Sequence, residues 1–568
     1  MQNFFNKKFN RYFHSARQKV KLHHGINFPS GINFFYGLKL RQRIKISQRI
    51  KYCSTLMIAT ALVCVNLSAC SFVRQDTQNA KSSDQLSVGG PQSIKADMPA
   101  VPAKLTEFYN QKVKWENCKD KSQCTKIKVP LDYKNPEKKS IELALKKRPA
   151  NKKAIGSLLI NPGGPGASGQ EMIANANYFF PKALQDNFDI IGFDPRGVGQ
   201  SAPVKCLSDD ELGKLLESAY PDTPEGKEKS QADAQRIAES CHEKSGDLLP
   251  HVGTENAARD MDIIRHLAGD PRLYYLGYSY GTSLGGMYAE LFPKNVGRMV
   301  LDGAVSSNIS NFEQSLAQMK GFEKALDAYL KDCLTKNKNK CPFKGNIADA
   351  RKQISYLLRQ TLNQPVPNEK GRKLTQSALI YGIVAALYDD ATWPVLSQAF
   401  TVLFQQQNPS IFLLLFDSYT GRKDDKFINN SMEANWAINC ADYQASGDPA
   451  KWAEESKILA KESPIFGATM QYNDAICAAW KYQPKNKIGP FTATGSAPIV
   501  VVGTTGDPAT PHQWAKDFAK NLQNGHLVTW EGEGHTAYGH STACVDNAIN
   551  AYLLNGSVPQ KNLVCPAK

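Results

Sequence analysis

A serine between two glycines is the strongest chemical signal in this 568-residue sequence. Ser279 is the centre of a Gly-Tyr-Ser-Tyr-Gly motif at 277–281, directly after an apolar run at 273–276 and before a helix-compatible stretch at 284–291. A sharp strand-to-helix turn of this kind exposes the serine hydroxyl, and flanking glycines relieve crowding. The helix N-terminus that follows also stabilises negative charge. The pattern therefore predicts that Ser279 is a nucleophile.

A serine hydroxyl needs a general base to take its proton, and a carboxylate commonly orients that base. We expect His535, in a loop just after an apolar strand, to be the base, with the nearby His540 as the alternative. We expect Asp507, in the loop after the preceding strand, to be the acid, with Asp302 as the alternative. The chain order Ser, Asp, His is one that such triads use.

The negative oxygen formed during acyl transfer needs two backbone N–H donors. One is expected from Tyr280, the residue after the nucleophile. The other is expected from the loop Asn-Pro-Gly-Gly-Pro-Gly at 161–166, with Gly164 as the candidate, because glycines let the backbone approach a substrate closely. This chemistry needs neither cofactor nor metal, and the sequence has no Cys-x-x-Cys pair that would indicate a zinc site.

Eight short β-rich runs, separated by helical stretches, are the elements that would position these residues. They are 126–129, 141–146, 156–160, 188–193, 273–276, 298–301, 498–502 and 527–530. The later runs are continuously apolar, as expected of strands that helices cover on both faces. The alternation predicts an α/β fold with a mostly parallel sheet, whose two parts are 105–303 and 497–568.

The long interval between the sixth and seventh predicted strands has a different pattern, with apolar residues three and four positions apart. Its helical segments are 312–331, 347–362, 374–388, 393–406 and 432–443. Because the sheet resumes afterwards with strands that need the first part to pair, we interpret 304–496 as a helical lid inserted into the sheet domain. A separate tandem domain is the less favoured interpretation.

The net charge of +16 is concentrated at the N-terminus: twelve Lys and Arg residues precede residue 52, and no Asp or Glu precedes Asp76. This distribution is typical of a targeting or anchoring segment and argues against nucleic-acid binding. Basic residues at 45–51 precede an apolar stretch at 55–65 that is too short to span a bilayer comfortably. We therefore predict that 1–70 is a basic leader with a signal peptide.

The leader ends in Leu-Ser-Ala-Cys at 67–70, which resembles the bacterial lipobox, so Cys70 is predicted to carry a lipid anchor. An ordinary signal peptide and an uncut anchor are the alternatives. Polar residues, glycine and proline at 71–104 indicate a flexible tether. We expect an exported, monomeric protein on the periplasmic face of a bacterial membrane. Ser71 favours the outer membrane by resemblance to Gram-negative sorting signals.

Ten cysteines follow the leader, and an even count in an exported chain suggests disulfides. Pairing of sequence neighbours is the simplest expectation, although the sequence leaves the connectivity open. The pairs would be 118–124, 206–241, 333–341, 440–477 and 544–565.

Four ordered motifs together resemble the secreted tripeptidyl-aminopeptidase-like α/β-hydrolases, which are relatives of prolyl aminopeptidase. They are Asn-Pro-Gly-Gly-Pro-Gly-Ala-Ser-Gly at 161–169, Asp-Pro-Arg-Gly-Val-Gly-Gln-Ser at 194–201, Gly-Tyr-Ser-Tyr-Gly-Thr at 277–282 and Gly-Asp-Pro-Ala-Thr-Pro at 506–511. The resemblance covers nearly all of 105–568. It implies an α/β-hydrolase fold with an eight-stranded sheet, and a serine exopeptidase that releases short peptides from free N-termini through an acyl-enzyme. Asp194 and Arg196 are expected to hold the loop after the fourth strand.

Recognition of a free α-ammonium group requires a carboxylate in a partly desolvated pocket, and the resemblance implies that the lid supplies it. Glu313 and Asp442 are the candidates. A carboxylesterase or lipase-type hydrolase would use the same triad, so an ester remains an alternative substrate to a peptide. A non-catalytic binding protein is the third possibility, which the presence of all three triad residues disfavours.

Overall fold

The computed structural model describes residues 90–568 except 307, 470–473 and 485–487. The predicted leader, with Cys70, and the first part of the predicted tether lie outside the described residues. The remaining part of that tether is attached to the folded body. The Gln92 N–H donates to the Leu554 carbonyl at 2.8 Å, and the Ile94 N–H donates to the Tyr274 hydroxyl at 2.7 Å. These bonds fix the chain from Gln92 onward, well before residue 104.

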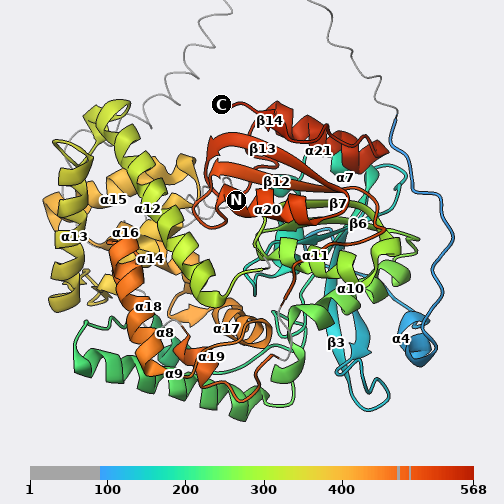
Figure 1. Cartoon of the computed structure of the whole chain (residues 1–568), viewed down its shortest axis with the longest axis horizontal. Coiled ribbons are helices and arrows are strands. Elements are labelled where there is room, and N and C mark those ends of the chain that lie inside the picture. Colours follow the sequence, from blue (N-terminus) through green and yellow to red (C-terminus); the bar gives the residue numbers. More distant parts are fainter. Residues whose placement is uncertain (1–89, 307, 470–473, 485–487) are drawn as a thin grey trace, which may run out of the picture. The chain divides into compact units, whose positions relative to one another are not determined.

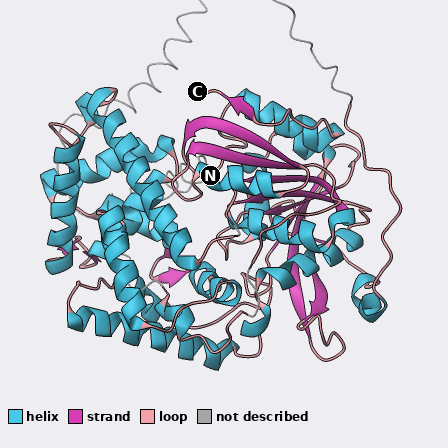
Figure 2. Ribbon diagram, viewed as in Figure 1, coloured by secondary structure: helices cyan, strands magenta, loops and turns pink. Residues whose placement is uncertain are grey.

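A ten-stranded sheet forms the centre of the fold (Figures 1 and 2). In spatial order its strands are β1 (Glu116–Asn117), β2 (Gln123–Pro130), β3 (Ser140–Arg148), β5 (Asp189–Phe193), β4 (Ser157–Asn161), β6 (Leu273–Tyr278), β7 (Val296–Asp302), β12 (Ile499–Gly506), β13 (Gly525–Glu533) and β14 (Leu563–Cys565). The pairs from β1 to β5 are antiparallel, and those from β5 to β14 are parallel. All eight predicted strands are present, and the short β1 and β14 extend the sheet at its edges.

Helices cover both faces of this sheet, which confirms the expected α/β fold. The helices α10 (Thr254–Leu267), α11 (Tyr280–Leu291) and α20 (His512–Asn521) share one apolar core with Ile499 and Val501 of β12. The helices α7 (Lys182–Asn187) and α21 (Ala543–Asn555) share the other with Val500 and Val502. Successive side chains of a strand point to opposite faces, so a strand buried on both faces is continuously apolar.

The predicted helical insertion lies between β7 and β12. Its helices are α12 (Asn311–Thr335), α13 (Ile347–Asn363), α14 (Gln376–Leu387), α15 (Trp393–Gln406), α16 (Ser410–Thr420), α17 (Ser431–Asp442), α18 (Pro449–Glu462) and α19 (Ala475–Ala478). Two short ribbons, β8 with β9 (Val366–Pro367, Lys373–Leu374) and β10 with β11 (Arg422–Lys423, Lys426–Phe427), lie among them. We keep the word lid for this insertion.

A second excursion, between β5 and β6, also packs with the lid. It contains α8 (Asp209–Glu217) and α9 (Pro224–Ser245). Leu212 and Leu216 of α8 are buried in the same apolar cluster as α12 to α16. Ala234 of α9 packs with Trp452 and Ala475 of the lid. Figure 1 shows both helices lying with the lid helices. Helices α8 and α9 therefore pack with the lid although they come from a separate part of the chain.

Five disulfides pair all ten cysteines of the described region, in the neighbour pairing that was expected. They are Cys118–Cys124, Cys206–Cys241, Cys333–Cys341, Cys440–Cys477 and Cys544–Cys565. Disulfides persist in oxidising compartments, which indicates that the folded body is extracytoplasmic. Among the described residues, no helix combines the length and apolar character needed to cross a membrane.

Arg196 holds the loop after β5 from a fully buried position. Its guanidinium donates to both carboxylate oxygens of Asp260, at 2.8 and 2.6 Å, and to the carbonyls of Pro130, Leu131 and His251. Removing one partner of a buried ion pair leaves the other charge uncompensated.

We expect Arg196→Met to lower the free energy of unfolding by about 3–5 kcal/mol, because Asp260 would stay buried without its partner. The matched control is Lys139→Met, which breaks the exposed ion pair with Asp247 and should leave the free energy of unfolding nearly unchanged. Denaturant unfolding of the two variants beside the wild type measures both values. Equal small losses in the two variants would contradict the prediction.

Candidate active site

Ser279 occupies the tight turn between β6 and α11, with φ = 54° and ψ = −124°. This is a strained conformation for a residue other than glycine, so its surroundings must hold it. The Ser279 N–H donates to the Asp302 carbonyl at 2.9 Å, and the Thr282 hydroxyl donates to the Ser279 carbonyl at 2.6 Å. A Cβ on Gly277 would lie 2.4 Å from the Gly281 carbonyl oxygen, so the turn requires glycine there.

Asp507 and His535 form a buried pair at the carboxyl ends of β12 and β13. His535 Nδ1 lies 2.9 Å from each carboxylate oxygen of Asp507. Asp507 also accepts hydrogen bonds from the N–H groups of Ala509 and Thr510, at 2.9 and 2.8 Å, which fix its orientation. An Nδ1–H that donates to Asp507 leaves Nε2 free of a proton and able to accept one.

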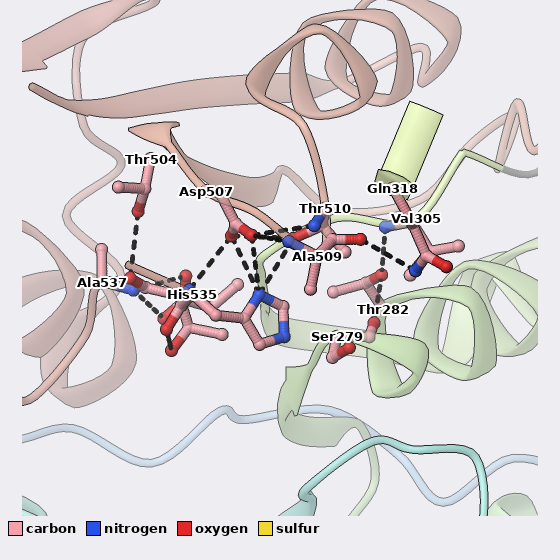
Figure 3. Close-up of polar contacts among 12 residues, drawn as sticks. Ser279, Thr282, Val305, Gln318, Thr504, Asp507, Ala509, Thr510, His535 and Ala537 are labelled. Carbon is pink, nitrogen blue, oxygen red and sulfur yellow. Dashed lines mark hydrogen bonds and ion pairs between the residues drawn. The ribbon is translucent and has the colours of Figure 1, made fainter. Parts of the chain in front are cut away.

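The structure brings the three predicted triad residues together. Figure 3 shows the His535 ring with its second nitrogen turned toward Ser279, on the side away from Asp507. Gly303 leaves room for the ring: a Cβ there would lie 3.2 Å from His535 Cε1, and its φ of +70° also favours glycine. The arrangement can pass a proton from a serine hydroxyl to an oriented imidazole.

The two alternative residues are engaged elsewhere. His540 Nε2 lies 3.1 Å from the Thr536 carbonyl oxygen, and burial lowers the pKa of His540 to about 4. The Asp302 carboxylate is fully buried and accepts hydrogen bonds from the backbone N–H groups of Ala537 and Tyr538. Neither contact belongs to a proton relay at Ser279.

The glycine-rich loop at 161–166 packs directly against the nucleophile. A Cβ on Gly163 would lie 2.8 Å from Ser279 Cβ and 3.3 Å from the Tyr280 nitrogen. The Gly163 N–H itself donates to the Asn161 side chain at 2.9 Å. The following glycine, Gly164, has φ = +111° and is the next N–H along this loop. The loop therefore lies where a second oxyanion donor is needed, beside the N–H of Tyr280.

Thr510 is a polar partner of the pair that the motif analysis did not identify. Its hydroxyl donates to Asp507 Oδ2 at 2.8 Å and lies 3.2 Å from His535 Nδ1. A hydrogen bond to a charged group contributes about 1.5–3 kcal/mol. The threonine in Gly-Asp-Pro-Ala-Thr-Pro, three positions after the acid, was the sequence signal for this contact.

We expect Thr510→Val to lower kcat/KM by about tenfold to a hundredfold, because valine keeps the shape but removes the hydroxyl that orients Asp507. Thr505→Val is the matched control, since the exposed Thr505 hydroxyl contacts the Gly532 carbonyl at 3.3 Å and not the pair. Steady-state hydrolysis of an aryl ester measures both variants. A Thr510→Val enzyme as active as Thr505→Val would contradict this role.

The two candidate ammonium-binding acids have different surroundings. Glu313 is exposed and closes the capping box of α12, where its carboxylate accepts from the N–H and hydroxyl of Ser310. Asp442, at the end of α17, is buried and accepts from the Thr254 N–H at 2.8 Å and hydroxyl at 2.5 Å. The Thr254 hydroxyl lies 2.6 Å from the Tyr280 hydroxyl. Hydrogen bonds therefore link Asp442 to the residue after Ser279.

Burial raises the pKa of Asp442 to about 7, so this carboxyl gains or loses its charge near neutral pH. A cation placed beside it would favour the ionised form. The position thus combines a desolvated carboxyl with a hydrogen-bonded link to Tyr280, the residue after the nucleophile.

The lid contacts the base directly, which the sequence analysis did not anticipate. The His535 N–H donates to the Tyr388 carbonyl at 2.8 Å, and the two rings meet edge to face with centroids 5.3 Å apart. The neighbouring residues Asp389 and Gly534 form an isolated β-bridge. The end of α14 is therefore attached to the segment that carries His535.

Comparisons with known proteins agree with this fold. The family described as alpha/beta hydrolase fold matches residues 156–340, and the family described as TAP-like protein matches residues 463–565. The chain is 36% identical over 477 residues to Serine protease Hip1 of Mycobacterium tuberculosis, which covers 80% of this chain and 91% of that protein. It is 33% identical over 467 residues to Carboxylesterase B of the same species, with 79% and 89% covered.

Tripeptidyl aminopeptidase of Streptomyces lividans is 28% identical over 469 residues, which cover 80% of this chain and 86% of that protein. The chain therefore belongs to the TAP-like family of the α/β-hydrolase superfamily, and it is a serine hydrolase.

Proposed function

We propose that the protein is an exported serine exopeptidase that releases short peptides from free N-termini, with Ser279, His535 and Asp507 as its catalytic triad. One observation carries the proposal: His535 Nδ1 lies 2.9 Å from both oxygens of Asp507, while the opposite side of the ring faces Ser279 in its strained turn. This is the geometry that a nucleophile, its base and the base's orienting acid require.

In the proposed mechanism, His535 takes the proton of the Ser279 hydroxyl as its oxygen attacks the acyl carbon. The N–H groups of Tyr280 and Gly164 stabilise the oxygen that becomes negative. His535 then gives its proton to the leaving amine, and the acyl-enzyme forms. In the second half, His535 deprotonates a water molecule that hydrolyses the ester of Ser279, and the proton returns to the serine. Asp507 stabilises the imidazolium in both halves.

Two features support a peptide with a free amine as the substrate. Relatives are named tripeptidyl aminopeptidase and serine protease. The buried Asp442 carboxyl, linked through Thr254 to Tyr280, would offer a desolvated partner to an α-ammonium group. A second candidate function is carboxylester hydrolysis, because a relative at 33% identity is named Carboxylesterase B. An ester substrate would use the same triad and would not need Asp442.

The test compares three substrates of the purified protein: a tripeptide amide with a free N-terminus, its N-acetylated twin and a short-chain aryl ester. We expect rapid cleavage of the free-amine peptide and little cleavage of the acetylated one. Asp442→Asn should then raise KM for the free-amine peptide and leave the ester rate unchanged. Hydrolysis of the ester with neither peptide cleaved would replace the exopeptidase proposal by the esterase.

We propose in addition that Cys70 carries a lipid anchor that holds the protein on the periplasmic face of a bacterial membrane. The lipobox-like sequence at 67–70 supports this. Cys70→Ser should move the protein from the membrane fraction to the soluble fraction of the producing cells. A membrane-bound Cys70→Ser protein would contradict the anchor.

A further inference from the structure

Asp302 contacts both the segment that follows His535 and the turn that carries Ser279. Its carboxylate accepts from the Ala537 N–H, at 3.0 and 3.1 Å to its two oxygens, and from the Tyr538 N–H at 2.8 Å. These N–H groups belong to residues 535–538, which we call the base loop because it begins with His535. The backbone carbonyl of Asp302 accepts from the Ser279 N–H at 2.9 Å. One residue thus bonds the base loop through its side chain and the nucleophile through its main chain.

The rest of the base loop is held by other elements. The His535 N–H donates to Tyr388 of the lid, and the Thr536 N–H donates to Asp507 at 3.1 Å. Thr536 has φ = +69°, an uncommon conformation for a residue with a side chain. The loop therefore depends on its acceptors for its shape, and Asp302 supplies the acceptors for two of its four N–H groups.

We propose that Asp302 is a positioning residue for the triad, whose carboxylate fixes the base loop relative to the Ser279 turn. The inference rests on the proposed triad. Asp302 does not touch the reacting atoms; it acts through His535. Small displacements of a base from its nucleophile cost large factors in rate, so such a residue should affect kcat more than KM.

The charge of Asp302 matters to this role. An ionised carboxylate accepts from both N–H groups, whereas protonation converts one oxygen into a donor. Burial raises the pKa of Asp302 to about 6; the N–H groups of the base loop and His535 oppose this rise, and Asp507 adds to it. Tyr278 of β6 is a further titratable group that faces it. Because the pKa of Asp302 lies above its ordinary value, this side chain is fully ionised only above about pH 6. It takes up a proton, and its positioning role is lost, as the pH falls through that value.

The test measures kcat and KM for an aryl ester against pH in the wild type, Asp302→Asn and Asp546→Asn. Asp546 is the matched control, because its carboxylate accepts from the Gly539 N–H at 2.9 Å, just beyond the base loop. We expect Asp302→Asn to lower kcat by about tenfold to a hundredfold with little change in KM. On the acid side of the pH profile, log kcat/KM of Asp302→Asn should fall with a slope that corresponds to one proton fewer than in the wild type. Asp546→Asn should show the same slope as the wild type on the acid side of the profile.

The proposal would be overturned if Asp302→Asn had the kcat of the wild type and the same fall of log kcat/KM at acid pH. If that variant does not fold, Asp302→Glu takes its place: the longer side chain keeps the carboxylate but displaces the base loop, so a lowered kcat with little change in KM is expected, and a wild-type kcat overturns the proposal. Ser279→Ala is assayed in parallel. An inactive Ser279→Ala beside an unaffected Asp302→Asn would reject only the positioning role, whereas an active Ser279→Ala would reject the triad itself.

Discussion

Replacing Ser279 by alanine is expected to lower kcat by about a millionfold for peptide and ester substrates alike, because no other group can form the acyl-enzyme. Substrate binding should persist, since the loops that line the site are unchanged. The loss is measured as the ratio of steady-state rates of the variant and the wild type, with thermal unfolding as a check that the fold is intact.

Ser283→Ala is the matched control for this experiment. Ser283 follows on the same helix, α11, and its buried hydroxyl has no hydrogen-bond partner among the described residues. Its removal should therefore leave the rates unchanged. Full activity of Ser279→Ala, or equal losses in the two variants, would move the nucleophile to another residue.

Replacing His535 by glutamine is expected to lower kcat by about ten-thousandfold to a millionfold, because the amide retains polarity but cannot accept the serine proton. The remaining rate would come from the oxyanion donors and from substrate binding. His540→Gln should change the rate little, because the half-buried His540 ring contacts the Thr536 carbonyl and the Trp530 ring. The same ester assay measures both variants.

The comparison between the two histidines also decides the assignment of the base. A His535→Gln protein that turns over at the wild-type rate, beside an inactive His540→Gln protein, would make His540 the base. Loss of activity in both the His535→Gln and the His540→Gln protein would indicate that His535 is the base and that His540 helps to hold the base loop.

The sheet could be predicted from sequence because its strands are locally distinct. In β12 the consecutive residues Ile499 and Val500 pack into opposite cores, so the apolar run itself reports burial on both faces. Lid helices with one apolar face were equally visible, and α15 begins and ends at the predicted residues. Helix α16 was not predicted, because residues 411–416 are continuously apolar and show no helical period; most of them are buried within the lid core.

The packing of α8 and α9 with the lid could not be predicted, for a different reason. Helix α9 is largely polar, and α8 has only a few apolar residues, so neither indicates what it packs against. Leu212 and Leu216 are buried only because helices from far along the chain cover them. A contact of this kind depends on the tertiary arrangement and leaves no local pattern.

The triad candidates follow from motifs because a nucleophile turn and strand-end loops are local features. The residues that support the triad cannot be recognised from such local features. Asp302 could be considered only as an alternative acid until its carboxylate was found against Ala537 and Tyr538, more than two hundred residues away. The contact of His535 with the Tyr388 carbonyl could not be predicted from the sequence either, because any residue at that position would supply a backbone carbonyl.

The most direct test of the account is covalent labelling with a fluorophosphonate, which reacts with activated serine nucleophiles, followed by mass spectrometry of the digested protein. We expect one adduct, on Ser279, that forms in the wild type and not in His535→Gln, with loss of hydrolysis in proportion to labelling. An adduct on a different serine that abolishes activity, or full inhibition with Ser279 unlabelled, would contradict the proposed active site.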